Sequence, residues 1–97
     1  MNIVDSKQQE IQDLCQKNNI GYLGVFGSVA RGDDNENSDV DLLVKFNKPI
    51  GLLELVHAQN ELSDALGRKV DLVTEGAVHP KIKPYIYKDL QTLYERT

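Results

Sequence analysis

The sequence predicts a small α/β (α+β) fold in which a mixed sheet of three to four strands carries helices packed on one face. Three observations lead to it. Short apolar runs typical of strands alternate with longer runs of helical periodicity. An 18-residue amphipathic segment, 50–67, separates two of these strands, as a crossover helix between parallel strands does. A third strand must run the opposite way for two polar motifs, described below, to meet.

Length and composition restrict the class of protein. The chain has 97 residues, which we expect to form one domain, 1–97, around one small core. Hydrophobic residues make up 40% and charged residues 27%, as is usual for soluble globular proteins. No apolar run approaches the roughly 20 residues of a membrane span, and the start lacks the parts of a signal peptide. With one cysteine, Cys15, and therefore no internal disulfide, we expect a cytoplasmic protein.

The charge of the chain is unevenly distributed. The net charge is −4, so we expect no direct binding to nucleic acid. Acidic residues are concentrated in 33–41, whereas basic residues gather at Arg68-Lys69 and among three later lysines. Carboxylates that crowd together repel one another unless cations lie among them. The acidic segment therefore predicts a cation site.

The first half of the chain predicts a helix, a strand and a short helix. Residues 1–19 form an amphipathic helix, and Cys15 lies on its apolar face, where a packed structural thiol is favoured over a nucleophile. Ile20–Phe26 is a strand whose glycines indicate close approach of another group. Ser28–Arg31 then forms one or two helical turns, and 33–37 is a polar loop that we expect to be exposed and mobile.

The second half predicts two further strands around a long helix. In the strand 39–46, alternate residues form one wholly apolar face, which helices must cover, and one face that begins with two aspartates. Helix 50–67 and strand 69–74 follow, and then a turn over 75–80 and a short helix over 81–89. Residues 92–94 form a last short strand or dock on the core. The expected apolar stripe of the long helix consists of Leu52, Leu55, Val56, Leu62 and Leu66.

Three aspartates are predicted to converge at one edge of the sheet. Asp39 and Asp41 lie about 7 Å apart along the start of one strand, and Asp71 lies near the start of the next. Because the crossover makes these strands parallel, all three carboxylates share an edge. Gly27-Ser28 follows the end of the first strand, so it meets the aspartates only if that strand is antiparallel to the second. An all-parallel sheet would separate the two motifs.

This combination of residues predicts a site for a metal-bound phosphate. Hard carboxylate oxygens select Mg²⁺ or Mn²⁺, and two such ions can stabilise the attacking and the leaving oxygen of an in-line displacement. The Gly27-Ser28 turn offers backbone N–H groups, a hydroxyl and a helix N-terminus to terminal phosphates. Arg31, one turn further on, can pair with a phosphate oxygen.

The spacing of these motifs resembles that of a known superfamily. Gly27-Ser28, ten residues, and then Asp39-x-Asp41 resemble the signature of DNA-polymerase-beta-like nucleotidyltransferases. The segments 27–32, 38–44 and 70–73 resemble more narrowly the minimal nucleotidyltransferases of that superfamily. The resemblance extends from Ile20 to the C-terminal Leu-Tyr-Glu, and it implies the polymerase-beta-like fold.

The resemblance also implies an activity and the residues that perform it. A nucleoside monophosphate passes from a nucleoside triphosphate, here ATP, to an acceptor hydroxyl, and pyrophosphate is released. Asp39 and Asp41 would bind two Mg²⁺ ions, for which Mn²⁺ can substitute. Asp71 would share one ion and assist deprotonation of the acceptor, and Gly27 and Ser28 would hold the triphosphate.

The family resemblance finally implies a partner. Minimal nucleotidyltransferases of this size pair with HEPN ribonuclease toxins, so the expected function is an antitoxin that adenylylates a toxin tyrosine within a hetero-oligomer. Two alternatives stay open: a binding-only antitoxin that neutralises its toxin without turnover, and transfer to a small hydroxylated molecule such as an aminoglycoside, for which the chain lacks a substrate domain. The expected docking surface is 75–97, although burial in the core is the favoured interpretation for Tyr85 and Tyr94, with Tyr87 left open.

Overall fold

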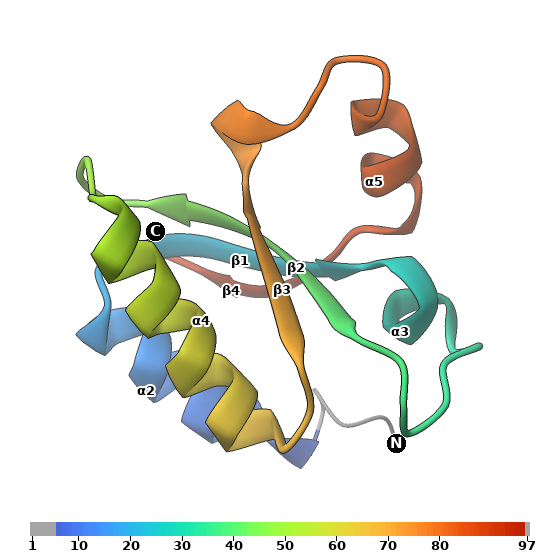
Figure 1. Cartoon of the computed structure of the whole chain (residues 1–97), viewed down its shortest axis with the longest axis horizontal. Coiled ribbons are helices and arrows are strands. Elements are labelled where there is room, and N and C mark those ends of the chain that lie inside the picture. The colour runs from blue at the N-terminus through green and yellow to red at the C-terminus, as the bar shows by residue number, and fades with distance from the viewer. Residues whose placement is uncertain (1–5, 97) are drawn as a thin grey trace.

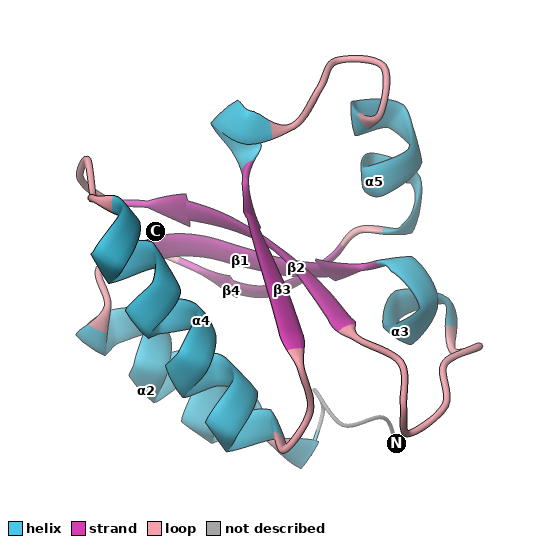
Figure 2. Cartoon of the chain, in the orientation of Figure 1, coloured by secondary structure: helices cyan, strands magenta, loops and turns pink. Residues whose placement is uncertain are grey.

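A four-stranded mixed sheet organises the computed structural model, which describes residues 6–96. The strand order is β3-β2-β1-β4, with β1 antiparallel to β2 and β4, and β2 parallel to β3 (Figures 1 and 2). The predicted mixed sheet and the predicted strand directions are confirmed. In chain order the elements are α2 (Gln8–Lys17), β1 (Ile20–Phe26), α3 (Gly27–Arg31), β2 (Val40–Phe46), α4 (Leu52–Leu66), β3 (Val70–Thr74), the 3₁₀ turn η1 (Glu75–Ala77), α5 (Lys83–Asp89) and β4 (Gln91–Glu95).

The two longer helices cover one face of the sheet. Helices α2 and α4 lie side by side on this face (Figure 1). Apolar side chains alternate toward them along each central strand, as in Val40, Leu42 and Val44 of β2, all fully buried. Cys15 is also fully buried in this core, which confirms its structural role. Helix α2 begins later than predicted, and positions 1–5 of the predicted helix lie outside the described residues.

Helix α5 packs on the opposite face of the sheet, in addition to the helices predicted to cover one face. Leu43 points away from α2 and α4 because strand residues alternate, yet it is 1% exposed. Ile86 of α5 lies against it and is also buried. Gly24 allows Leu90, at the end of α5, to approach β1, since a Cβ at this glycine would lie 2.7 Å from the Leu90 Cδ1 atom. A close approach at a glycine of this strand was predicted from the sequence.

Several apolar side chains remain exposed where the sequence predicts burial. On α4 the apolar stripe is partly buried from Leu55 and buried from Ala58, whereas Leu52 is 74% exposed and Val56 is 41% exposed. Helical periodicity identifies the apolar face, but α4 is longer than the surface it covers. On the C-terminal segment Tyr94 packs against the core as predicted, but the expected burial of Tyr85 is wrong, because it is 74% exposed. Within residues 6–96, no helix has the length and apolar character to cross a membrane.

Candidate active site

The turn after β1 lies directly against a carboxylate of β2. Antiparallel pairing places Phe26 opposite Asp41, so the chain turns into α3 beside that aspartate. Gly27 has a φ of 76°, in the left-handed region, and a Cβ added to it would lie 2.5 Å from the Asp41 Oδ2 atom. Only a glycine allows both this backbone conformation and this approach. The two predicted half-motifs therefore meet, as the antiparallel strand requires.

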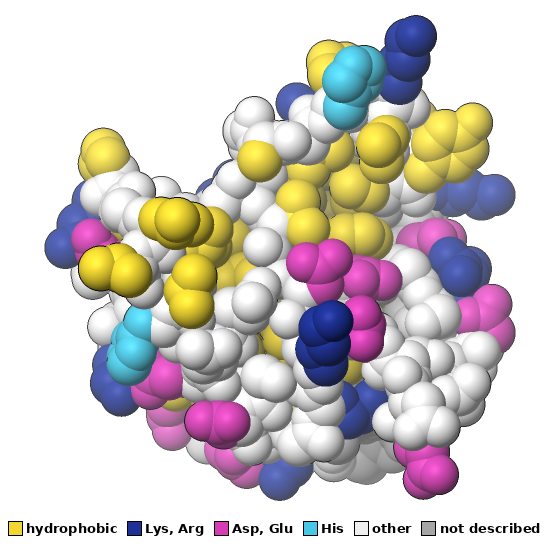
Figure 3. All heavy atoms as spheres, viewed as in Figure 1, with side chains coloured by type: hydrophobic (Ala, Val, Ile, Leu, Met, Phe, Trp, Pro, Cys, Tyr) yellow, Lys and Arg dark blue, Asp and Glu magenta, His cyan; other side chains and the backbone are white. Residues whose placement is uncertain are grey.

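The aspartates occupy neighbouring positions at one edge of the sheet. Asp41 pairs directly with Asp71 in the parallel register of β2 and β3. Asp39 precedes β2 by one residue and belongs to the same face as Asp41 by alternation. Figure 3 shows acidic side chains gathered in the middle of the viewed face, beside a basic one and below a hydrophobic area. The predicted convergence of the three carboxylates is consistent with this placement.

Asp41 is the member of the group whose electrostatics are most perturbed. Partial burial of its carboxyl group raises its pKa above the ordinary value, and the neighbouring charges of Asp71 and Asp39 raise it further. The guanidinium of Arg31 acts in the opposite direction and lowers that pKa. The protein itself thus provides too little positive charge to balance the negative charge of ionised Asp41. A bound cation would provide the missing positive charge.

The donor set fits a magnesium ion that is completed by a ligand. Among residues 6–96, no three acidic, histidine or cysteine side chains are arranged as a ready-made metal cage. The Asp39 carboxylate lies 3.9 Å from the Lys69 ammonium. The three carboxylates offer only hard oxygen donors on an accessible edge, the chemistry that Mg²⁺ and Mn²⁺ prefer when phosphate and water complete the coordination. Asp39, Asp41 and Asp71 could therefore hold such an ion.

The remaining predicted residues lie on α3. Ser28 is half-buried in the first turn, and its carbonyl accepts a hydrogen bond from the Asp33 N–H. The helix has five residues, so it offers the free N–H groups of its first turn more than a long-helix dipole. Arg31 is already paired: its guanidinium donates to Asp89 at 2.9 Å and to Asp33 at 3.2 Å, and these bonds raise its pKa. These two bonds use the Nε and Nη1 atoms, so Nη2 is the group that could donate to a phosphate without displacing either carboxylate.

Sequence reasoning missed an ion pair that holds the acidic loop 33–37. The guanidinium of Arg68 donates to Asp34 at 2.9 Å, and the Asp34 side chain is only 18% exposed. The prediction that 33–37 is simply a solvated, mobile loop is therefore wrong for Asp34. The signal was present, since the acidic segment and the basic pair Arg68-Lys69 both stood out in the charge distribution. Their partnership depends on the crossover, which brings the start of β3 beside the start of β2.

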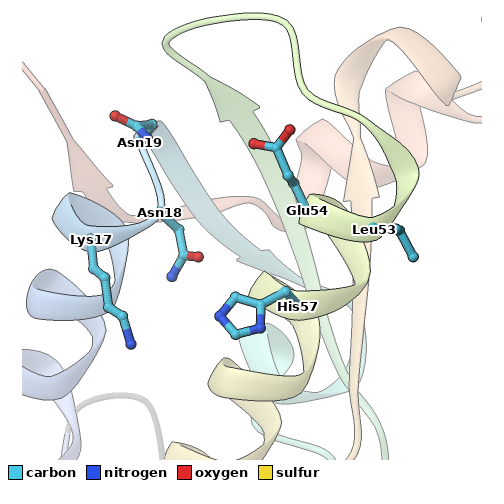
Figure 4. A pocket seen from close by; sticks show the side chains of 6 residues that line it. All are labelled: Lys17, Asn18, Asn19, Leu53, Glu54 and His57. Atoms are coloured by element: carbon cyan, nitrogen blue, oxygen red, sulfur yellow. The ribbon is translucent and has the colours of Figure 1, made fainter.

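Two surface pockets differ in their relation to these residues. One of about 370 Å³ lies between α3 and α5 and includes Gly27 and Arg31 in its lining, so it adjoins the carboxylate edge. The other, of about 350 Å³, lies between the end of α2 and the start of α4 (Figure 4). Its lining contains none of the predicted site residues. We therefore place the candidate site at the sheet edge and not in the α2–α4 pocket, which is lined by Lys17, Asn18, Asn19, Leu53, Glu54 and His57.

Comparison with known proteins identifies the family. Residues 9–97 match the family model described as polymerase beta, nucleotidyltransferase. MJ1217 of Methanocaldococcus jannaschii, a candidate protein adenylyltransferase, is 44% identical over 79% of this chain and 80% of its own length. The protein adenylyltransferase MntA of Thermococcus cleftensis is 33% identical over 81% of this chain and 80% of its own length.

Solved structures agree with this assignment. A candidate minimal nucleotidyltransferase superposes with a TM-score of 0.80 at 31% identity, over 94% of this chain and 95% of that one. A chain of the complex between a tri-AMPylated HEPN toxin of Shewanella oneidensis and its MNT antitoxin has a TM-score of 0.72. That likeness covers 95% of this chain and 72% of the other at 18% identity, so it concerns the fold alone. Together with the glycine turn that meets the paired aspartates, these matches show that the chain belongs to the polymerase-beta nucleotidyltransferase family.

Proposed function

We propose that this chain is a Mg²⁺-dependent protein adenylyltransferase that transfers AMP from ATP to a hydroxyl, a tyrosine, of a cognate HEPN toxin and thereby acts as an antitoxin. The observation that carries the proposal is the close approach of the Asp41 carboxylate to Gly27, where an added Cβ would lie 2.5 Å from the Oδ2 atom. It brings the Gly27-Ser28 turn (the phosphate turn) and the sheet edge that carries the three aspartates (the acidic edge) together in one site. Relatives named as protein adenylyltransferases, and the fold of a complex that contains an AMPylated HEPN toxin, support the choice of acceptor.

The reaction exchanges a phosphoanhydride bond of ATP for a phosphoester bond on the acceptor. The acceptor oxygen forms a bond to the α-phosphorus of ATP, and the bond from that phosphorus to the oxygen bridging to the β-phosphate breaks. Pyrophosphate leaves, and the hydroxyl proton must pass to a base. Asp71 is our candidate for that role, because it is exposed and lies opposite Asp41 in the β2–β3 register.

Each side of the site has its own task in this proposal. The free N–H groups and the Ser28 hydroxyl at the start of α3 bind the triphosphate. Asp39 and Asp41, with Asp71, would hold two Mg²⁺ ions. The positive charge of these ions would offset the negative charge that develops on the attacking and leaving oxygens. Burial and then the acidic neighbours raise the pKa of Asp41, which indicates that the chain alone leaves the charge of this carboxylate unbalanced.

The pocket beside Gly27 provides room for a bound ligand next to the phosphate turn. Ile82 and Tyr85 line this pocket and are 53% and 74% exposed. An apolar and aromatic surface of this kind, next to the site, suits a protein acceptor better than a small polar molecule. This favours a partner toxin over an aminoglycoside.

A direct test uses the protein together with the product of its neighbouring gene, which we expect to be the toxin. The two proteins are incubated with Mg²⁺ and ATP, the intact mass of the toxin is measured, and toxicity is followed in cells. We expect the toxin to gain adenylyl groups and to lose its toxicity. The double variant Asp39→Ala plus Asp41→Ala should abolish the adduct. Asp13→Ala plus Asp64→Ala removes the same charge from exposed positions on α2 and α4, and should leave the adduct unchanged.

The same experiment separates the binding-only alternative. If the toxin gains no adduct, and the double variant at Asp39 and Asp41 still suppresses toxicity, the antitoxin acts by forming a complex and the proposed transfer is wrong. If suppression and the adduct disappear together, turnover is the neutralising event.

A further inference from the structure

Arg68 ties together the two chain segments that carry the aspartates. Its Nη2 atom donates to the carbonyl of Ser38 at 2.6 Å and to that of Asn35 at 2.8 Å, while Nη1 pairs with Asp34 at 2.9 Å. Ser38 directly precedes Asp39, and Arg68 itself lies three residues before Asp71. One guanidinium thus connects the residues that directly precede β2 with those that directly precede β3.

Further hydrogen bonds hold the main chain of Arg68 and fold the loop that its guanidinium contacts. The Ser63 hydroxyl donates to the Arg68 carbonyl at 2.7 Å, directly after the turn that ends α4. On the loop side, the Ser38 N–H donates to the Asn35 carbonyl at 3.0 Å, and the Asn35 N–H donates to the Ser38 hydroxyl at 3.1 Å. The guanidinium therefore contacts a loop that is already folded on itself, so a change at Arg68 should move the loop as a unit.

The burial of the Arg68 side chain indicates that it does more than stabilise the fold. The Arg68 side chain is 13% exposed, and within residues 6–96 its Nε atom is buried without a hydrogen-bond partner. Leaving a buried donor unpaired costs free energy. A lysine would avoid this cost, but its single ammonium lacks the planar fork that reaches a carboxylate and two carbonyls at once. The arginine is explained if those acceptors must be held in a defined arrangement.

We infer that Arg68 is a positioning residue of the adenylyl-transfer site: it fixes Asp39 relative to Asp41 and Asp71, so that the three carboxylates can share a divalent cation. This inference rests on the proposed function. Arg68 touches neither the reacting atoms nor the ion, and it acts through the backbone of Ser38. Residues that orient metal ligands in this indirect way typically contribute about 10- to 100-fold to metal affinity or activity.

The test measures cation binding without turnover. Mn²⁺ is titrated into the protein with α,β-methylene-ATP, whose α–β linkage cannot be cleaved, and free Mn²⁺ is counted by electron paramagnetic resonance. The variants are Arg68→Gln and Arg68→Lys, measured well below their melting temperatures. Arg96→Gln removes the same charge from an exposed arginine at the end of β4 and serves as the matched control.

We expect both Arg68 variants to bind Mn²⁺ about 10- to 100-fold more weakly, whereas Arg96→Gln should bind like the wild type. In the transfer assay with the toxin, kcat should fall and recover in part at high Mg²⁺, while KM for the toxin stays constant. A folded Arg68→Gln protein with unchanged Mn²⁺ affinity would overturn the inference, since a merely structural role would lower only the melting temperature.

Two further outcomes are distinguishable. If Arg68→Gln does not fold, Arg68→Lys carries the test, because a lysine keeps the charge but lacks the planar fork that reaches both carbonyls; unchanged Mn²⁺ binding by the folded Arg68→Lys protein would then refute the inference. If the wild-type chain binds no Mn²⁺ in the presence of the nucleotide analogue, the proposed metal site itself is wrong, and the role of Arg68 is refuted with it.

Discussion

The substitution Gly27→Ala tests whether the phosphate turn and the acidic edge form one site. The added methyl group meets two obstacles. The backbone φ of 76° is unfavourable for any residue with a Cβ, and that Cβ would lie 2.5 Å from the Asp41 Oδ2 atom. Either the turn or the carboxylate must move. We expect a moderate loss of stability and a much larger loss of transfer.

The two effects can be estimated separately. A left-handed conformation costs an alanine about 1–2 kcal/mol, and for a chain of this length each kcal/mol lowers the melting temperature by roughly 4–8 °C. Displacing a catalytic group by about 1 Å can reduce the rate by about 100-fold. That factor corresponds to about 2.7 kcal/mol of activation free energy. The loss of activity should therefore exceed what unfolding alone produces.

Gly67→Ala provides the matched control. Gly67 has a φ of 68°, so the backbone strain is similar, but nothing lies within 4 Å of an added Cβ. Both variants are compared by thermal unfolding and by the rate of toxin adenylylation, at a temperature where each is folded. Gly67→Ala should lose stability and retain its rate. If Gly27→Ala also retains the wild-type rate, the close contact with Asp41 has no part in catalysis and our reasoning about the site is refuted.

Three further predictions concern the carboxylates, the core thiol and α5. Because burial and the charges of Asp71 and Asp39 raise the folded-state pKa of Asp41, its ionised form destabilises the metal-free protein. Asp41→Asn should therefore melt higher than the wild type at pH 7.5 without metal, and this difference should shrink as the pH falls through the folded-state pKa toward the ordinary aspartate value of about 4. An unchanged difference across this pH range would contradict the shift. Burial raises the pKa of Cys15 to about 12, so iodoacetamide at pH 8 should modify it only after denaturation, as intact mass would reveal. Ile86→Ala should lower the free energy of unfolding in urea by about 2–5 kcal/mol, because Ile86 is buried against Leu43; a negligible change would show that α5 is not anchored there.

The part of the fold that surrounds the site could be predicted because local patterns and one geometric requirement agree. Alternation in 39–46 separates the aspartate face from the apolar face, and the crossover helix makes β2 and β3 parallel. The Gly27-Ser28 turn can meet Asp41 only if β1 is antiparallel, and this direction is the one observed. The first two steps needed only strand periodicity and the rule for crossover connections, and the third needed the requirement that the two motifs meet.

The remainder depends on contacts that no local pattern specifies. Arg68 and Asp34 are 34 positions apart in the sequence, and their pairing follows from the way α4 returns the chain to the sheet. Helical spacing placed Leu52 on the apolar face of α4, but it could not indicate that the first turn of this helix stays uncovered. The exposure of Tyr85 has a similar cause, since α5 contacts the sheet through Ile86 and leaves its other face free.

The central claim, that this site transfers a nucleotidyl group, is tested most directly by following the two ends of ATP. The protein, the toxin proposed as its partner and Mg²⁺ are incubated in parallel with ATP carrying radioactive phosphorus at the α position and at the γ position, and label on the toxin is measured. We predict that the α label is retained on the toxin and that the γ label is released in pyrophosphate. Both should depend on Asp39 and Asp41. Retention of the γ label would indicate phosphoryl transfer, and retention of neither label would indicate binding without turnover; either result would contradict the account.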